Sequence, residues 1–209
     1  MSDLAGRNVV NPLKDVTALI LAGGQGRRMG GCDKGLEPLA GLPLVGHVQA
    51  CLRGRVADLL ISANRHLEDY RGRGVRVVPD LQEGYQGPLM GIYSGLRTAS
   101  TPWVLVVPCD TPVLPHDLVV RMAAGIGDHR IAVAHDGVRL HPVVLLLERS
   151  LADDLHAALV MGERKVGRWI ERHAWTPVDF SDCPECFVNL NTEEEKRDLE
   201  SRLNREERA

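Results

Sequence analysis

Short apolar runs that alternate with helical patterns are the feature that most limits the folds open to this sequence. Glycine, proline or polar residues follow each run, which is typical of strands buried inside a parallel sheet. The expected strands are 16–21, 58–62, 75–78, 103–107, 131–134, 143–147 and 187–190. The expected helices are 43–52, 89–98, 115–124, 151–159, 166–172 and 193–205. This alternation predicts a three-layer α/β/α fold with an open, mostly parallel, twisted sheet of the Rossmann-like type.

The chain has 209 residues, of which 44% are hydrophobic and 25% charged, as is ordinary for globular proteins. Residues 1–15 are interpreted as a flexible leader, because they are polar and lack the basic and then apolar design of a signal peptide. No internal repeat or low-complexity linker divides the remainder. Residues 16–209 are therefore expected to form a single domain.

Composition argues against several classes of function. The net charge of −3 and an aromatic content of 4% do not favour a nucleic acid partner. The sequence has no run of 18 apolar residues, so no membrane span is expected. Five irregularly spaced cysteines indicate a reducing compartment, and we expect a cytoplasmic protein. Cys183 and Cys186 form a C-x-x-C pair without a second pair at zinc spacing, so a zinc site is not expected.

A loop rich in glycine and cations follows the first expected strand. Residues 23–34 contain five glycines together with Arg27, Arg28 and Lys34. Glycines allow backbone N–H groups to approach an anion closely, and the cations add donors for phosphate oxygens. The dinucleotide motif G-x-G-x-x-G does not fit, since Met29 stands at its last glycine. The P-loop does not fit either, because Gly35 rather than serine or threonine follows Lys34.

Polar residues also follow later strands, where an open parallel sheet places its ligands. Asp110 ends the most apolar strand, and its carboxylate suits Mg²⁺, although an Asx-turn or a helix cap is an alternative. Asn64 offers amide donors and acceptors to a base or ribose, but it equally suits a turn. Asp80 is ambiguous in the same way. Cys109 has no evident partner base and is interpreted as a small core residue.

The glycine loop resembles the signature of the molybdenum cofactor guanylyltransferases, a branch of the glycosyltransferase-A-like nucleotidyltransferases. The resemblance begins with Leu21-Ala22-Gly23-Gly24, Arg28-Met29-Gly30-Gly31 and Asp33-Lys34. Further landmarks follow in family order, namely Ser62-Ala63-Asn64-Arg65-His66, Pro79-Asp80, Gly87-Pro88-Leu89, Pro108-Cys109-Asp110-Thr111-Pro112, His141-Pro142 and Asn189-Leu190-Asn191-Thr192. The matches cover most of the chain, from residue 21 to residue 192.

The resemblance implies a nucleotidyltransferase fold and a Mg²⁺-dependent transfer of GMP from GTP to the phosphate of molybdenum-molybdopterin. It implies catalytic roles for Lys34 and Asp110, with Mg²⁺ on Asp110. The implied nucleotide-binding residues are Leu21, Ala22, Gly23, Gly24, Arg28, Lys34, Asn64, Asp80 and Asp110. The implied pterin-substrate residues are His141, Asn189 and Asn191. Transient contact with cofactor-insertion proteins and recipient molybdoenzymes is a further option that the resemblance leaves open.

Residue chemistry alone supports a more general mechanism. A phosphate monoester with a second pKa of about 6 is largely ionised at neutral pH, so the reaction needs no serine, cysteine or histidine nucleophile. Catalysis then depends on positioning and on neutralising the developing charge. Cytidylyl transfer to the same cofactor, nucleotidyl transfer to a sugar phosphate, and non-catalytic carriage of GTP or pterin are the alternatives.

Overall fold

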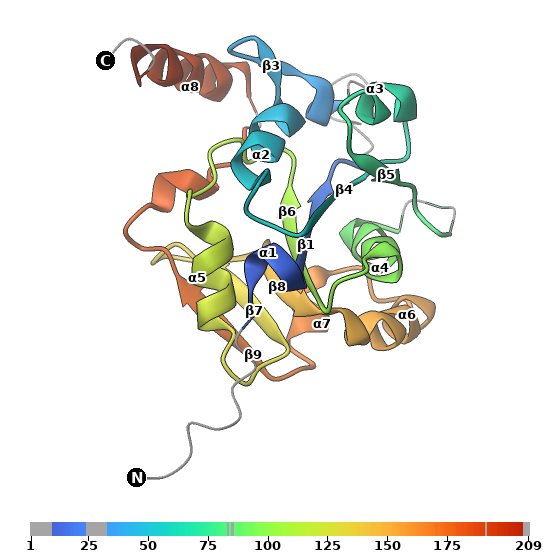
Figure 1. Cartoon of the computed structure of the whole chain (residues 1–209). Helices are drawn as coiled ribbons and strands as arrows, with labels where there is room; N and C mark the ends of the chain where they lie inside the picture. Colours follow the sequence, from blue (N-terminus) through green and yellow to red (C-terminus); the bar gives the residue numbers. More distant parts are fainter. Residues whose placement is uncertain (1–9, 24–32, 83, 85, 191, 207–209) are drawn as a thin grey trace.

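The computed structural model describes residues 10–23, 33–82, 84, 86–190 and 192–206. Its centre is a seven-stranded sheet with the strand order β5-β4-β1-β6-β8-β7-β9 (Figure 1). The strands are β1 (Val16–Leu21), β4 (Asp58–Ser62), β5 (Arg76–Val78), β6 (Trp103–Pro108), β7 (Ile131–His135), β8 (Leu140–Glu148) and β9 (Trp175–Asp179). A separate two-stranded sheet pairs β2 (Pro38–Leu39) with β3 (Leu42–Pro43).

The pairing of the strands confirms the predicted, mostly parallel sheet. Strand β1 pairs in parallel with β4 and with β6, so that Leu21 lies opposite both Ser62 and Pro108. The β4–β5 and β7–β9 pairings are also parallel, whereas β8 runs antiparallel to both of its neighbours. Because parallel strands end at the same edge of a sheet, the loops after β1, β4 and β6 begin side by side.

Helices cover both faces of the sheet (Figure 1). The α-helices are α1 (Pro12–Asp15), α2 (Leu44–Leu52), α3 (Leu67–Arg71), α4 (Pro88–Thr98), α5 (Leu118–Gly125), α6 (Ala152–Val160), α7 (Val166–Ile170) and α8 (Glu193–Glu206). The 3-10 helices are η2 (Lys34–Leu36), η3 (Arg149–Leu151) and η4 (Pro184–Phe187). A reciprocal capping box between Thr192 and Glu195 begins α8, as the sequence predicts.

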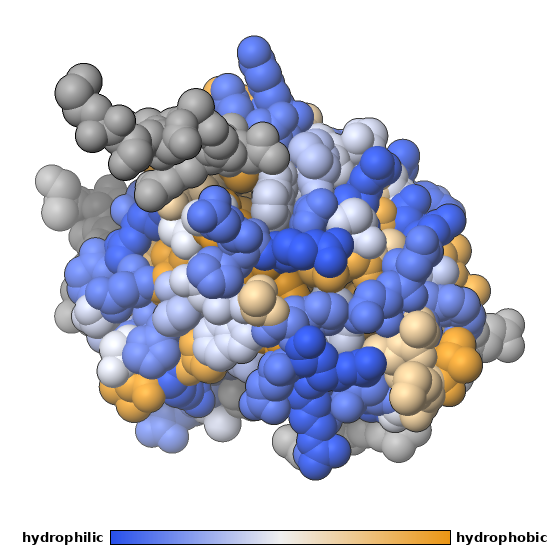
Figure 2. Space-filling view, turned by 90° about the horizontal axis from the view of Figure 1, so that it is seen from below, coloured by the Kyte–Doolittle hydropathy of each residue, from blue (hydrophilic) through white to orange (hydrophobic). Residues whose placement is uncertain are grey.

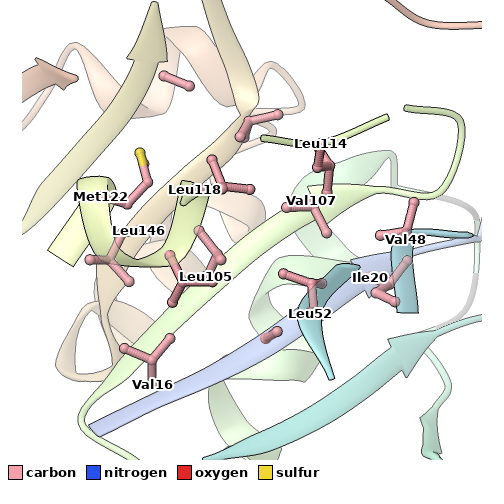
Figure 3. Packing of buried hydrophobic residues seen from close by; sticks show 14 of the residues in the cluster. Val16, Ile20, Val48, Leu52, Leu105, Val107, Leu114, Leu118, Met122 and Leu146 are labelled. Atoms are coloured by element: carbon pink, nitrogen blue, oxygen red, sulfur yellow. The ribbon is translucent and has the colours of Figure 1, made fainter. Parts of the chain in front are cut away.

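Alternate side chains of β1 enter two separate hydrophobic clusters, as the pleat of a strand requires. Ile20 belongs to the cluster on one face of the sheet, where it lies beside Leu52 of α2; Met122 of α5 belongs to another part of the same cluster (Figure 3). Leu19 points to the other face and joins the cluster that α4, α6 and α7 supply, including Leu89. The predicted three-layer arrangement is therefore confirmed.

Two glycines of α4, Gly91 and Gly95, face the sheet and allow the helix to pack closely against it. A Cβ atom added to Gly95 would lie only 2.3 Å from Cδ2 of Leu19, and one added to Gly91 would lie 2.7 Å from Oγ of Ser62. Only glycine therefore permits this approach at the two positions. The close contact fixes α4, which begins at Pro88, directly after Gly87.

Two sequence predictions for the last part of the sheet are wrong. Residues 187–190 form no strand, because Phe187 ends η4 and the N–H of Leu190 bonds to the carbonyl oxygen of Asp110 instead of a neighbouring strand. The last strand is β9, which the sequence analysis missed. Its central Pro177 is tolerated because β9 lies at the edge of the described sheet, next to β7.

Smaller differences concern the ends of elements. Residues 1–9 of the expected leader lie outside the described residues, but Pro12–Asp15 form helix α1, which Asn11 caps. Helix α5 begins at Leu118 rather than at Pro115. His141 lies inside β8 rather than before a strand, since β8 begins at Leu140.

The face of the molecule seen from below is mostly hydrophilic, with apolar residues in scattered groups (Figure 2). Exposed large apolar side chains of the described residues include Val120, Val138, Val160 and Met161. No helix in this described part of the chain combines the length and the apolar character needed to cross a membrane.

Candidate active site

The loops after β1, β4 and β6 are tied together by backbone hydrogen bonds. The N–H of Ala22 donates to the carbonyl oxygen of Ser62 at 2.8 Å, and the N–H of Cys109 donates to that of Leu21 at 3.0 Å. A Cβ atom on Gly23 would lie 3.3 Å from Nδ2 of Asn64. Leu21, Ala22 and Gly23, which are predicted to bind the nucleotide, therefore lie beside residues at the end of β4 or directly after β4 and β6.

Lys34 and Asp110 meet at this edge of the sheet. Lys34 begins η2, and its Nζ donates to Oδ2 of Asp110 at 2.8 Å. The two side chains are 24% and 21% exposed, so their charged ends are partly shielded from water but accessible to a ligand. The sequence assigns these two residues to catalysis separately, and the structure brings them into one ion pair.

Asn64 and Asp80 form a second polar pair. Nδ2 of Asn64 donates to Oδ2 of Asp80, and the N–H of Asp80 donates to Oδ1 of Asn64, each at 2.8 Å. Burial raises the pKa of the Asp80 carboxyl, and the hydrogen bond from Asn64 partly offsets this increase. Two neighbouring strands thus hold an amide and a carboxylate in fixed orientation, as recognition of a base or ribose requires.

The segment before α8 returns to the same edge. Oγ1 of Thr111 donates to Oδ1 of Asn189 at 2.9 Å, and the N–H of Leu190 donates to the carbonyl oxygen of Asp110 at 3.0 Å. Asn189 was predicted to lie near the second substrate. The structure places it beside Asp110, the expected metal ligand.

His141 takes part in a buried hydrogen bond that the sequence did not reveal. Its Nε2 lies 2.7 Å from Oδ2 of Asp136, and its ring stacks on Phe187 with 4.9 Å between the ring centroids. The backbone N–H of Arg139 is the main cause that lowers the pKa of Asp136, and the His141 ring and the N–H of Val138 lower it further. Phe187 connects His141 to the segment that carries Asn189, so both belong to the same end of the sheet.

Three of the predicted site residues cannot be placed. Gly24, Arg28 and Asn191 lie outside the described residues, as do Arg27 and the rest of the loop through Cys32. The predicted nucleotide-binding residues that the structure describes are Leu21, Ala22, Gly23, Lys34, Asn64, Asp80 and Asp110.

Sequence reasoning missed two side chains that support the site. The hydroxyl of Tyr70 donates to Oδ1 of Asp33 at 2.6 Å, and Asp33 caps η2, in which Lys34 lies. In the sequence Asp33 stands out only as part of the signature, and its place next to Lys34 is the available signal. Nothing in the sequence distinguishes Tyr70, because its partner lies 37 residues away.

Two of the described cysteines have thiols that ionise less readily than usual. Burial raises the pKa of the Cys109 thiol far above its ordinary value, which agrees with its interpretation as a core residue. Burial likewise raises the pKa of Cys186 to about 12. No group of three or more His, Cys, Asp or Glu side chains within the described residues could hold a metal ion.

The side chains at Asp110 have the donor chemistry that the expected Mg²⁺ requires. This cation keeps several water ligands and usually takes only one or two carboxylates from the protein together with phosphate oxygens. Asp110 supplies one accessible carboxylate just after the end of a strand. The ammonium of Lys34, whose Nζ lies 2.8 Å from Oδ2 of Asp110, supplies a positive charge for the phosphates. The residues therefore fit a magnesium ion that arrives with a nucleoside triphosphate.

Comparison with known proteins gives one consistent result. Residues 18–178 match the family described as the MobA-like NTP transferase domain. A molybdenum cofactor guanylyltransferase of Shewanella pealeana is 44% identical over 194 residues, which cover 92% of this chain and 97% of the relative. The enzyme of the same name from Shewanella baltica is 46% identical over 186 residues, or 88% of this chain and 95% of the relative.

Solved structures with low sequence identity share the fold. The molybdopterin-guanine dinucleotide biosynthesis protein A of Archaeoglobus fulgidus aligns with a TM-score of 0.75 and 21% identity, covering 90% of this chain and 99% of that one. A nucleotidyl transferase from Methanothermobacter aligns with a TM-score of 0.73 and 21% identity, covering 91% and 98%.

Proposed function

This chain belongs to the molybdenum cofactor guanylyltransferases, within the family of MobA-like NTP transferases, and we propose that it transfers GMP from GTP to the phosphate of molybdenum-molybdopterin. The reaction forms the guanine dinucleotide cofactor and releases pyrophosphate. The observation that carries the proposal is the contact between Lys34 of η2 and Asp110, which follows β6, the parallel neighbour of β1. A cation and a carboxylate in contact, both accessible, suit a triphosphate that brings a divalent metal.

The proposed chemistry is a displacement at the α-phosphorus of GTP. A phosphate oxygen of molybdopterin forms the new bond to the α-phosphorus, and the bond from that atom to the oxygen of the β-phosphate breaks. Because the attacking phosphate is largely ionised at neutral pH, no residue has to remove its proton. Lys34 contributes by binding the triphosphate and by balancing the negative charge that pyrophosphate acquires as it leaves.

The divalent metal is proposed to be Mg²⁺, with Asp110 as its protein ligand. When bound, such an ion neutralises charge on phosphate oxygens and orients them for displacement. In its absence, the ion pair with Lys34 compensates the charge of Asp110. Positioning by Lys34 and Asp110 then supplies most of the catalysis that this chain provides.

The remaining residues divide between the two substrates. We assign the guanine nucleotide to Leu21, Ala22, Gly23, Gly24, Arg28, Asn64 and Asp80, and the pterin side to His141, Asn189 and Asn191. The hydrogen bond between Asn189 and Thr111, next to Asp110, supports an approach of the second substrate from that side. Approach from this side would bring the attacking phosphate of molybdopterin close to the triphosphate of GTP.

The test is the release of pyrophosphate from GTP when molybdopterin is added in the presence of Mg²⁺, with CTP and ATP in parallel reactions. We expect release with GTP and little with the other two. A preference for CTP would instead identify cytidylyl transfer. Binding of labelled GTP without turnover would identify a carrier of nucleotide or pterin.

Location and partners follow from the same proposal. Cys51, Cys109, Cys183 and Cys186 are free thiols, as suits the reducing cytoplasm in which we place the protein. Its product would pass to proteins that insert the cofactor and to recipient molybdoenzymes, which are proposed as transient partners.

A further inference from the structure

A buried hydrogen bond joins α3 to the residue that precedes Lys34. Tyr70 is completely buried, and its hydroxyl donates to Oδ1 of Asp33 at 2.6 Å. Asp33 itself is only 8% exposed. A hydrogen bond to a buried carboxylate is among the stronger kinds in proteins, because the acceptor is charged and water is excluded. The proposed function gives neither residue a role.

The same carboxylate also organises the backbone on the far side of Lys34. Oδ1 of Asp33 accepts the N–H of Gly35 at 3.2 Å, which caps η2. Nδ1 of His66 lies 3.8 Å from Oδ2 of Asp33. The Asp33 carboxylate therefore holds the first turn of η2, in which Lys34 is the first residue.

Gly35 is packed against Tyr70 as well. A Cβ atom at Gly35 would lie 2.4 Å from the hydroxyl oxygen of Tyr70, and 3.4 Å from both Cβ of Ala22 and Sγ of Cys109. Tyr70 thus bonds to the residue before Lys34 and packs on the residue after it. The backbone of Lys34 is fixed from both sides by one side chain.

The position of this backbone decides where the lysine ammonium can reach. The side chain of Lys34 has four rotatable bonds and would lose much conformational entropy in any single pose. A rigid backbone lowers the cost of placing Nζ beside Asp110, at the observed 2.8 Å. Tyr70 also belongs to α3, which begins directly after the loop that carries Asn64, so its hydroxyl connects the base side of the site with the phosphate side.

We propose that Tyr70, acting through Asp33, is the positioning residue for Lys34 in nucleotidyl transfer. The inference rests on the role of Lys34 in the proposed function. It differs from a merely structural role of a buried tyrosine, because a structural role would affect activity whether or not Lys34 is present.

A double-mutant cycle separates the two roles. The variants are Tyr70→Phe, which removes only the hydroxyl, and Asp33→Ala, each made in the wild type and in a Lys34→Ala background. Tyr93→Phe is the matched control, because Tyr93 stacks on His156 outside the site. The initial rate of pyrophosphate release from radiolabelled GTP gives kcat/KM, and thermal unfolding shows that each variant is folded at the assay temperature.

We expect Tyr70→Phe to lower kcat/KM by about 10-fold in the wild type, the effect of one hydrogen bond to a charged group. Asp33→Ala should cost at least as much. In the Lys34→Ala background both substitutions should have almost no further effect, and Tyr93→Phe should have none in either background. An equal loss in the two backgrounds, or no loss in the wild type, would overturn the proposal.

The same proteins keep the outcome separate from that of the proposed function. If the wild type releases no pyrophosphate with any substrate, the proposed function fails. In that case the double-mutant cycle uses the dissociation constant of each variant for GTP in the presence of Mg²⁺, measured by titration calorimetry. Tyr70→Phe should weaken GTP binding only when Lys34 is present, and an equal weakening or none in both backgrounds again overturns the role of Tyr70.

Discussion

Nζ of Lys34 lies 2.8 Å from Oδ2 of Asp110, although the two residues are 76 positions apart in the chain. The contact forms because β1 and β6 are adjacent parallel strands, so that the loops after them begin at the same edge of the sheet. Neither side chain is more than about a quarter exposed. The two charges therefore attract each other strongly. Each can attract a ligand charge of the opposite sign in the same way when the Lys34–Asp110 contact opens.

Removing either member of this pair should impair catalysis more than folding. Lys34→Ala and Asp110→Ala are each expected to lower kcat by about 10²-fold or more, because stabilisation of the transition state is lost. Pyrophosphate release measures this loss. Arg97→Ala, which breaks an exposed ion pair with Asp153, is the control and should keep the wild-type rate. Near-full rates of the folded Lys34 and Asp110 variants would contradict the assigned roles.

Asn189→Asp should distinguish the two substrates. The change keeps an oxygen that accepts the hydrogen bond from Thr111 but replaces an amide donor with a negative charge. We expect the KM for molybdopterin to rise about 10-fold, through repulsion of its phosphate, while the KM for GTP stays within about twofold. Steady-state kinetics with each substrate varied in turn supply both values. Asn11→Asp, at the cap of α1, is the control, and a rise in the KM for GTP alone would move Asn189 to the nucleotide side.

The sequence predicts the parts of this molecule that local pattern determines. Strands β1 and β4 have the predicted bounds, and Gly87-Pro88 begins α4 as expected, because apolar runs and turn residues act over short distances. Strand β9 was missed, since Pro177 argues against a strand unless the strand lies at an edge. Phe187 and Leu190 were misread as a strand, because residues that anchor a loop are as apolar as strand residues.

For the site, the family resemblance identified Lys34 and Asp110, but the sequence could not predict that the two side chains are in contact. That contact depends on the strand order, which the alternation of elements leaves open. The sequence also could not predict the supporting contacts Tyr70–Asp33 and His141–Asp136. Each is a tertiary contact of a side chain whose residue type has several ordinary structural roles.

The close approach of α4 to the sheet gives a prediction about stability. Gly95→Ala should lower the free energy of unfolding by about 1–3 kcal/mol, because the new methyl group overlaps Leu19 and the gain in helix propensity is smaller than the strain. Gly167→Ala in α7 is the matched control, since its Cβ would meet nothing nearer than 3.9 Å. It should be neutral or stabilising by up to about 1 kcal/mol. Urea unfolding of both variants measures the difference, and equal changes would show that α4 can move away from β1.

The Asp136–His141 pair gives the last prediction, a dependence of stability on pH. Hydrogen bonds from the backbone N–H groups of Arg139 and Val138, and from His141, lower the pKa of Asp136 below its ordinary value of 3.8. The folded state therefore favours the ionised carboxylate of Asp136. The stabilisation that this carboxylate provides is fully present at pH values well above 3.8, and it is lost as the pH falls below 3.8 toward the pKa of the folded state. Asp136→Asn should be less stable than the wild type at neutral pH, and the difference should shrink as the pH falls below about 4. Urea unfolding between about pH 7 and pH 3 tests this, with the exposed Asp153→Asn as the control for removal of a carboxylate. A difference that stays constant across this range would mean that Asp136 contributes through its shape and not through its charge.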